Sequence, residues 1–166
     1  MGAYPLVRLL QIRVLRETAA RSAVTLRREQ LAGAEKNVME ARQLWASFKQ
    51  RRPEREAALF ADICGKMVDQ QRMDRYHADR AALAARDLEL EEATRQAEKV
   101  RDEAHEALDT ALAALQLASR KLQKFKEHRS LWEKQEQRRV ELAEEAEQED
   151  NISPRAATLA TGPLAD

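Results

Sequence analysis

Residues 102–105, Asp-Glu-Ala-His, come closest to known catalytic chemistry in this sequence. The same residue types mark a metal-binding strand in a large class of ATP-driven helicases, where the Asp reaches Mg²⁺ and the Glu positions water. That chemistry needs a buried apolar strand before the motif and a glycine-rich loop around the phosphates. Here the preceding residues, ATRQAEKV, are polar with a helical pattern, and glycines at 2, 33, 65 and 162 cannot form such a loop. We therefore interpret residues 102–105 as part of a solvated helix face.

Two carboxylate–imidazole pairs are the next candidates for chemistry. Asp74 with His77, and Asp102 with His105, each place the two groups one helical turn apart, as in di-iron helical bundles. The pairs lie about 42 Å apart along one helix, so they cannot share an ion within one chain. Cys64 is the single cysteine and has no histidine beside it in the sequence. We therefore expect no catalytic residue, no metal ligand and no cofactor.

The composition is typical of long helices. Of 166 residues, 35% are charged and only 4% aromatic, with four Gly and four Pro, and the 29 basic residues equal the 29 acidic ones. Such a chain favours a coiled coil over a compact core. One cysteine fits the reducing cytosol, and no stretch approaches the roughly 18 apolar residues of a membrane span. The first residues lack a signal peptide and a myristoylation site, so we expect a cytoplasmic chain.

The first predicted helix covers about residues 5–51. Pro5 suits a first helical position, and Pro53 should end or kink the helix near Arg51. Before residue 16 the apolar residues cover more than one face. Further along, a seam with spacings of three and four is formed by Leu31, Ala34, Val38, Ala41, Trp45 and Phe48.

The second predicted helix covers about residues 67–148 and carries a period of seven. The repeat consists of Tyr76, Leu83, Leu90, Ala97, Ala104, Ala111, Ala118, Phe125 and Trp132, and a second series ends in Leu108, Leu115 and Leu122. A sustained period of seven predicts a left-handed supercoil.

A turn between the two helices predicts the fold. Residues 52–66 should form a kink and turn with Gly65 at its tip, which makes residues 1–150 an all-α, long antiparallel two-helix coiled-coil hairpin. Trp45 should then lie opposite Leu83, each arm should extend about 90 Å, and residues beyond about 126 should overhang helix 1. The last residues, 151–166, are rich in Pro, Gly, Ser and Thr, and we expect a disordered tail.

Two surfaces of this hairpin are candidates for binding. The end away from the turn is basic, since residues 1–28 hold six arginines and one acid, and residues 120–139 hold eight basic and three acidic residues. This is either ordinary helix-surface charge or an end that enters an acidic or polar partner. Nucleic acid is disfavoured by the few aromatics and zero net charge. Around the turn, Phe60, Ile63, Met67, Val68, Met73 and Tyr76 either form an exposed binding site or close the seam internally.

Three segments carry a resemblance to a known family: YPLVRLLQIRVLRE at the start, LFADICGKMVDQQRMDRYHADRAAL at the turn, and KFKEHRSLWEKQEQRRVELAEEAEQED in helix 2. Over about residues 4–150 the chain resembles the central stalk proteins of bacterial type III secretion, the YscO and FliJ family, and is more similar to the YscO branch.

The resemblance implies a non-enzymatic stalk that enters the hexameric export ATPase and links it to the cytoplasmic domain of the export gate. Export chaperones are a further partner, and nucleic acid and membrane insertion are not expected. It implies a virulence-related protein on the cytoplasmic side of the inner-membrane apparatus, acting as a monomer. The implied ATPase-binding residues are Leu6, Arg8, Leu10, Arg13, Arg16, Lys124, Arg129 and Trp132, and the implied gate-binding residues are Met73 and Tyr76. The alternative is a generic coiled-coil scaffold or dimeric adaptor.

Overall fold

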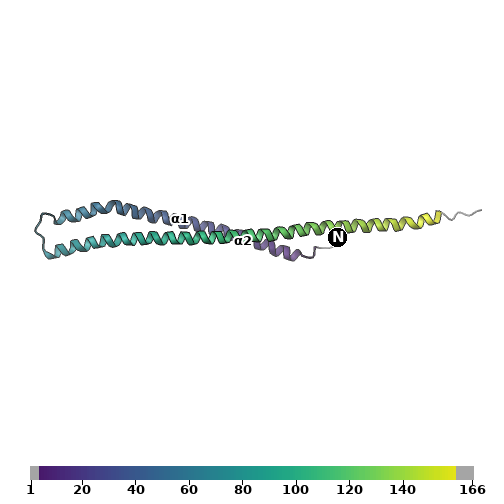
Figure 1. Ribbon diagram of the computed structural model, residues 1–166, viewed down its shortest axis with the longest axis horizontal. Coiled ribbons are helices and arrows are strands. Elements are labelled where there is room, and N and C mark those ends of the chain that lie inside the picture. Colours follow the sequence, from purple (N-terminus) through teal and green to yellow (C-terminus); the bar gives the residue numbers. More distant parts are fainter. Residues whose placement is uncertain (1–3, 160–166) are drawn as a thin grey trace, which may run out of the picture. The chain divides into compact units, whose positions relative to one another are not determined.

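The computed structural model describes residues 4–159, which form two helices and no strand. Helix α1 spans Val7–Ile63, 57 residues, and helix α2 spans Gln70–Leu159, 90 residues. The two helices run back from the turn side by side in opposite directions (Figure 1). The predicted all-α antiparallel hairpin is thus confirmed. The contacts divide the chain into a turn unit, residues 21–114, and a terminal unit, residues 1–20 with 115–166.

The turn unit is held together by the predicted seam. The six apolar residues predicted on α1 are all buried or half-buried, with Ala34 and Val38 at its centre. The nine members of the period-seven series on α2 are all half-buried as well, and Ala118, Phe125 and Trp132 among them belong to the terminal unit. A two-helix pair can only half-bury most of its seam, because each helix has a single neighbour and its outer face remains in water.

In the turn unit, polar residues occupy the α2 positions that continue the Leu108, Leu115 and Leu122 series toward the turn. The Trp45 indole donates a hydrogen bond of 2.8 Å to Asp87, and Arg52 donates one of 2.6 Å to the other carboxylate oxygen. Thr94 is buried and its hydroxyl bonds to the Leu90 carbonyl in the preceding turn. Trp45, expected opposite Leu83, is therefore bonded one helical turn further along α2. A bonded polar residue in an apolar seam favours one register over others.

The turn between the helices is built by one glycine and one aspartate. Gly65 has a φ of 70°, the left-handed conformation that glycine adopts after a helix end. The Asp69 carboxylate accepts a hydrogen bond of 2.9 Å from the backbone N–H of Arg72. This is an N-cap, which satisfies a donor that the first turn of α2 would otherwise leave unpaired. Gly65 thus lies in the turn, as the sequence predicted.

Three predicted boundaries differ from the structure. Helix α1 does not end near Arg51 but continues through Pro53 to Ile63. Pro53 is exposed, so water can bond to the carbonyl that its missing N–H leaves free, while the seam on both sides keeps the helix together. Helix α2 begins at Gln70 rather than at 67, because Asp69 caps it. Helix α2 also includes residues 151–159 of the expected disordered tail, and 160–166 lie outside the described residues.

The terminal unit pairs the start of α1 with the later part of α2. Tyr4, in the turn before α1, is buried, and its hydroxyl lies 2.7 Å from His128 Nδ1. Its ring also makes an edge contact with Trp132, with the ring centres 5.5 Å apart. The expectation that helix 2 overhangs beyond about residue 126 is therefore wrong up to Trp132, because the segment before α1 covers it.

Candidate partner-binding surfaces

The helicase-like motif lies on the outer face of α2. Asp102 is exposed and bonds to the neighbouring Arg101, and exposed His105 lies 3.3 Å from Asp109. Ala104 is half-buried in the seam, as the heptad predicted, which turns its neighbours outward. The solvated helix face predicted for residues 102–105 is confirmed. Across the described residues, no three His, Cys, Asp or Glu side chains gather in a way that could hold a metal ion.

The basic residues at the start of α1 fall into two groups. Arg8 and Arg16 are exposed and form no ion pair within residues 4–159. Arg13 is half-buried, and its guanidinium carbon lies 5.4 Å from the centre of the Phe125 ring on α2, in a cation–π contact. Arg8 and Arg16 are therefore available to a partner, whereas Arg13 helps to hold the two helices together.

The candidate residues on α2 divide in the same way. Lys124 and Arg129 are exposed, and Arg129 forms a 2.7 Å hydrogen bond with Glu133 one turn further on. Trp132 is half-buried against Tyr4. Sequence reasoning did not single out Tyr4. Its place two residues before the first predicted helical leucine was the signal that it could pack back onto the partner helix.

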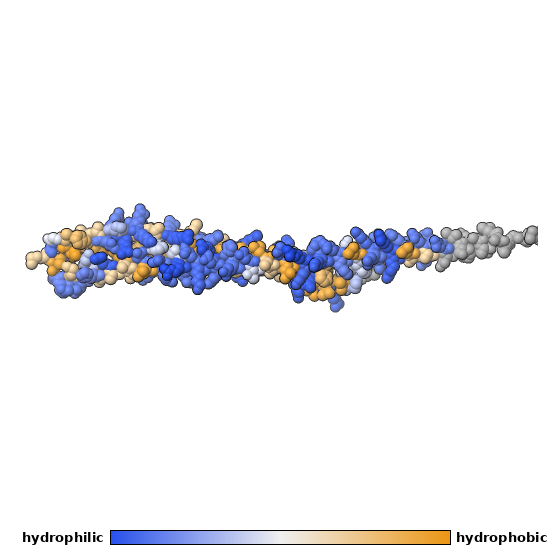
Figure 2. All heavy atoms as spheres, in the orientation of Figure 1, coloured by the Kyte–Doolittle hydropathy of each residue, from blue (hydrophilic) through white to orange (hydrophobic). Residues whose placement is uncertain are grey.

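Exposed apolar residues surround the first turns of α1. Leu6 and Leu10 are half-buried, while five other apolar side chains are between 40% and 69% exposed: Val7, Leu9, Ile12, Val14 and Leu15. Figure 2 shows hydrophobic residues gathered on the surface over this part of the chain. A helix that is apolar around most of its circumference is normally buried on more than one side. Within residues 4–159 the terminal unit supplies one neighbouring helix, α2, so part of the apolar circumference of this segment remains exposed.

The turn region exposes different residues from those that the family resemblance implied. Met73 and Tyr76 are half-buried in the seam, and Tyr76 makes an edge contact with the His77 ring and a cation–π contact with Arg80. Phe60 is 54% exposed and Met67 is fully exposed. Of the two interpretations of this patch, Met73 and Tyr76 fit the internal closing of the seam, whereas Phe60 and Met67 fit an exposed binding site.

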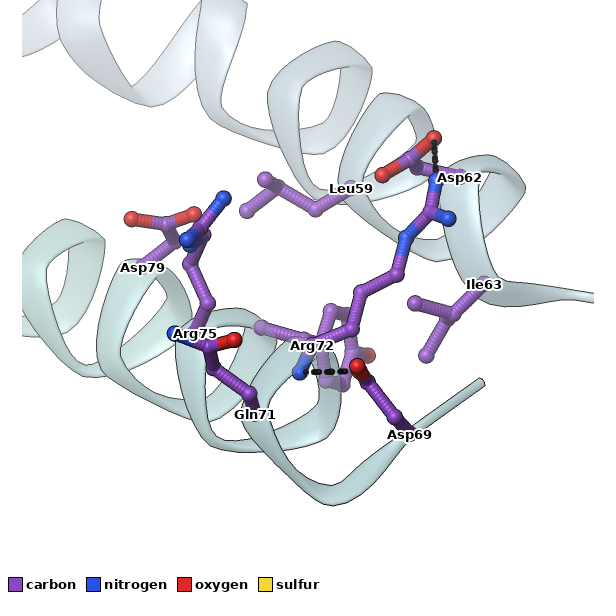
Figure 3. A pocket seen from close by; sticks show the side chains of 9 residues that line it. Leu59, Asp62, Ile63, Asp69, Gln71, Arg72, Arg75 and Asp79 are labelled. Carbon is purple, nitrogen blue, oxygen red and sulfur yellow. Dashed lines mark hydrogen bonds and ion pairs between the residues drawn. The ribbon is translucent and has the colours of Figure 1, made fainter. Parts of the chain in front are cut away.

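A cleft of about 310 Å³ lies between the helix ends beside the turn (Figure 3). Arg72 reaches across it from α2 to Asp62 on α1, with a nitrogen–oxygen distance of 3.0 Å, and Lys66 approaches the same carboxylate at 3.5 Å. The hydrogen bond and positive charge of Arg72 hold the pKa of Asp62 below its ordinary value. An ion pair between the two helices thus crosses the cleft, and Arg75 and Asp79 line it as well.

These features define a class of protein: a coiled-coil hairpin with exposed apolar and basic helix faces. The family profile described as Type III secretion protein YscO matches residues 6–154. The chain belongs to this family, as the sequence resemblance indicated, and it is a type III secretion protein. Neither the curated proteins nor the solved structures contain a match. No helix in the described part of the chain is long and apolar enough to cross a bilayer.

Proposed function

We propose that this protein is the non-enzymatic central stalk of a bacterial type III secretion system. In this proposal the terminal unit enters the hexameric export ATPase, and the turn region contacts the cytoplasmic domain of the export gate. One copy acts per ring, on the cytoplasmic side of the inner-membrane apparatus, in support of virulence-related export. Export chaperones are further partners.

The observation that carries the proposal is the apolar circumference of α1 between Val7 and Leu15. These side chains are exposed in the free chain although the helix pattern is that of a segment buried on several sides. Entering a ring of subunits would bury them from several directions at once. Exposed Arg8 and Arg16 stand among them, where complementary acidic groups of a partner would raise the association rate and set the orientation.

The stalk needs no chemistry of its own to affect the ATPase. A protein that binds one conformation of a ring better than another shifts the ring toward that conformation. Differential contact of the apolar segment with successive ring states is therefore sufficient to alter ATP turnover.

The test reverses the charges of the two exposed arginines. Arg13 is left intact, because its contact with Phe125 belongs to the hairpin. The Arg8→Glu, Arg16→Glu variant should keep its helical circular dichroism while losing at least about tenfold in affinity for the ATPase of the same system. Its stimulation of ATP hydrolysis and its support of secretion should fall with it.

A matched control carries the same change in net charge elsewhere on α1. Arg28 and Lys36 are exposed residues of the turn unit, and their reversal to Glu should leave ATPase binding near the wild-type level. If the Arg8, Arg16 variant remains folded and stimulates the ATPase as well as the wild type does, the docking surface is wrongly assigned.

The gate contact is assigned to the turn region, with Met73 and Tyr76 from the family resemblance and the exposed Phe60 and Met67 beside them. Met67→Ser and Phe60→Ser change fully or largely exposed side chains, so they should leave the hairpin folded. Both should weaken binding to the purified gate domain. If both variants bind the gate domain as well as the wild type does, either the contact is made by Met73 and Tyr76 or the turn region does not bind the gate.

The alternative, a generic scaffold or dimeric adaptor, predicts a different result. An adaptor should bind neither the ATPase nor the gate domain in purified form, and it should lose its function when its own pairing is blocked.

A further inference from the structure

A groove of about 630 Å³ runs along one side of the turn unit between α1 and α2. Its centre is apolar and shallow, formed by Ala58 and Leu59 from α1 and by Ala82 and Leu83 from α2. The two leucines are half-buried in the seam and the two alanines face outward. Small outward residues allow another helix to approach closely, because no long side chain stands in its way.

Charges at the two ends of the groove have opposite sign. Arg55 and Arg86 also line the neighbouring cleft further from the turn, which contains neither Asp62 nor Asp79. Asp62 and Asp79 in turn line the cleft at the turn, which contains neither Arg55 nor Arg86, although Arg72 and Arg75 line it further from the groove. The groove therefore has two arginines at one end and two aspartates at the other, with the alanines between them.

The sequence shows how this separation arises. Residues 55–62 read REAALFAD and residues 79–86 read DRAALAAR, so each helix has an Arg and an Asp seven residues apart around a central Ala-Ala-Leu. The charge order is opposite in the two segments. Because the helices are antiparallel, this opposite order brings both arginines to the same end. Seven residues correspond to about 10.5 Å, too far for the ends to neutralise each other within one chain.

Two of the four charged groups have no partner within the described residues. Arg86 pairs with Glu89, and Asp62 with Arg72 and Lys66. Arg55 and Asp79 form no ion pair within residues 4–159. They come from different helices and from opposite ends of the groove, so a ligand that satisfies both must itself carry an acid and a base in the matching order.

We propose that the occupant of this groove is a second copy of the chain, docked antiparallel about a two-fold axis through Ala58 and Ala82. A two-fold interface uses the same patch on both copies and requires that the patch complement itself. This rotation exchanges the arginine end of one groove with the aspartate end of the other. The result is four Arg–Asp contacts around an apolar centre, and the two hairpins together form a local four-helix arrangement.

The paired form is a state of the free protein. The family resemblance implies a monomer in the assembled apparatus, and a weak, reversible pair of the free protein is compatible with it. The interface lies in the turn unit, whereas the proposed ATPase contact lies in the terminal unit. Loss of self-association and loss of ATPase binding are thus separable by mutation.

Sedimentation velocity of the full chain between about 1 and 500 µM covers the range in which a weak pair with a micromolar Kd forms. The wild type should change from monomer to dimer across this range. The Arg55→Glu, Arg86→Glu variant and the Asp62→Arg, Asp79→Arg variant should each raise the Kd at least about 100-fold, because all four contacts become repulsive. An equimolar mixture of the two variants should associate again, since one groove is then acidic and the other basic.

Two further variants separate this effect from damage to the hairpin. Ala58→Gln with Ala82→Gln places longer side chains at two exposed helical positions. Gln is also a good helix former, so the hairpin should stay folded while the second copy can no longer approach closely. Arg28→Glu with Lys99→Glu gives the same change in net charge as the arginine reversal and should self-associate like the wild type.

The proposal is overturned if the wild type stays monomeric at the highest concentration. It is also overturned if the reversed variants pair as well as the wild type, or if their mixture fails to associate. A groove that then binds a helix of the gate or of a chaperone instead would identify a different occupant.

Discussion

Removing the carboxylate of Asp87 should destabilise the turn unit measurably. In the Asp87→Ala variant the Trp45 indole N–H, now bonded at 2.8 Å, loses its acceptor in a half-buried position. A donor left without a partner costs about 1–3 kcal/mol when buried. The Asp87 side chain is 24% exposed, and water can therefore reach part of the site, so we expect about 1–1.5 kcal/mol. Arg52 loses its half-buried contact with Asp87 but keeps its 2.8 Å contact with Glu56, so its guanidinium still has a partner.

Urea unfolding followed by tryptophan fluorescence measures this loss where it occurs. The chain has two tryptophans, and replacing Trp132 by Phe leaves Trp45 as the reporter inside the turn unit. The Asp87→Ala change should lower the urea concentration at the unfolding midpoint. The dependence of the unfolding free energy on urea should not change, since the surface exposed on unfolding stays nearly the same. Asp87→Asn retains an acceptor oxygen and should cost less than about half as much.

A double-mutant cycle provides the decisive control. The variants that carry Trp45→Phe lack the fluorescence reporter, so the unfolding of all variants in the cycle is followed by circular dichroism. Combining Trp45→Phe with Asp87→Ala should cost about 1 kcal/mol less than the sum of the single changes, because both remove the same bond. Additive effects, or an Asp87→Ala variant as stable as its parent, would refute the assignment of Asp87 as a bonded seam residue.

Three further predictions concern single positions. Gly33→Ala should stabilise the chain by about 0.5–1 kcal/mol in thermal unfolding, because Gly33 lies inside α1 with open space around it, whereas Gly65→Ala should cost roughly 1–2 kcal/mol because its φ is 70°. Arg72→Met should raise the pKa of Asp62 toward its ordinary value in an NMR titration; the stabilisation from the lowered pKa is present above the ordinary carboxyl pKa and is lost as the pH falls through the lowered one. Asp102→Asn should change neither secretion nor stability, and ATP hydrolysis by the purified protein that this change abolishes would overturn its placement on a solvated face.

The seam could be predicted from the sequence because it depends on local spacing. Side chains three and four residues apart share one face of a helix, so a repeat of seven identifies the buried positions before any partner is known. The same reasoning turned Asp102 outward once Ala104 was assigned to the seam. Gly65 was predictable for a similar reason, since few residues adopt a positive φ without strain.

The effect of Pro53 could not be predicted from its local rule. A proline inside a helix removes one hydrogen bond, and the rule alone favours a break. Packing of α1 against α2 on both sides of Pro53 outweighs that loss, and the exposed position of the ring leaves the freed carbonyl to water. The balance depends on a neighbour far away in the sequence.

For the candidate binding residues, too, some properties follow from local sequence and others from long-range packing. The sequence determined that the start of α1 is basic and apolar over more than one face, because composition and helical period are local properties. Only the tertiary structure separated Arg13, stacked on Phe125, from the exposed Arg8 and Arg16. It also decided that Tyr4 covers α2 and that opposite charges gather at opposite ends of one groove. These outcomes depend on which turn of one helix faces which turn of the other, and that register is fixed by long-range contacts that no local pattern contains.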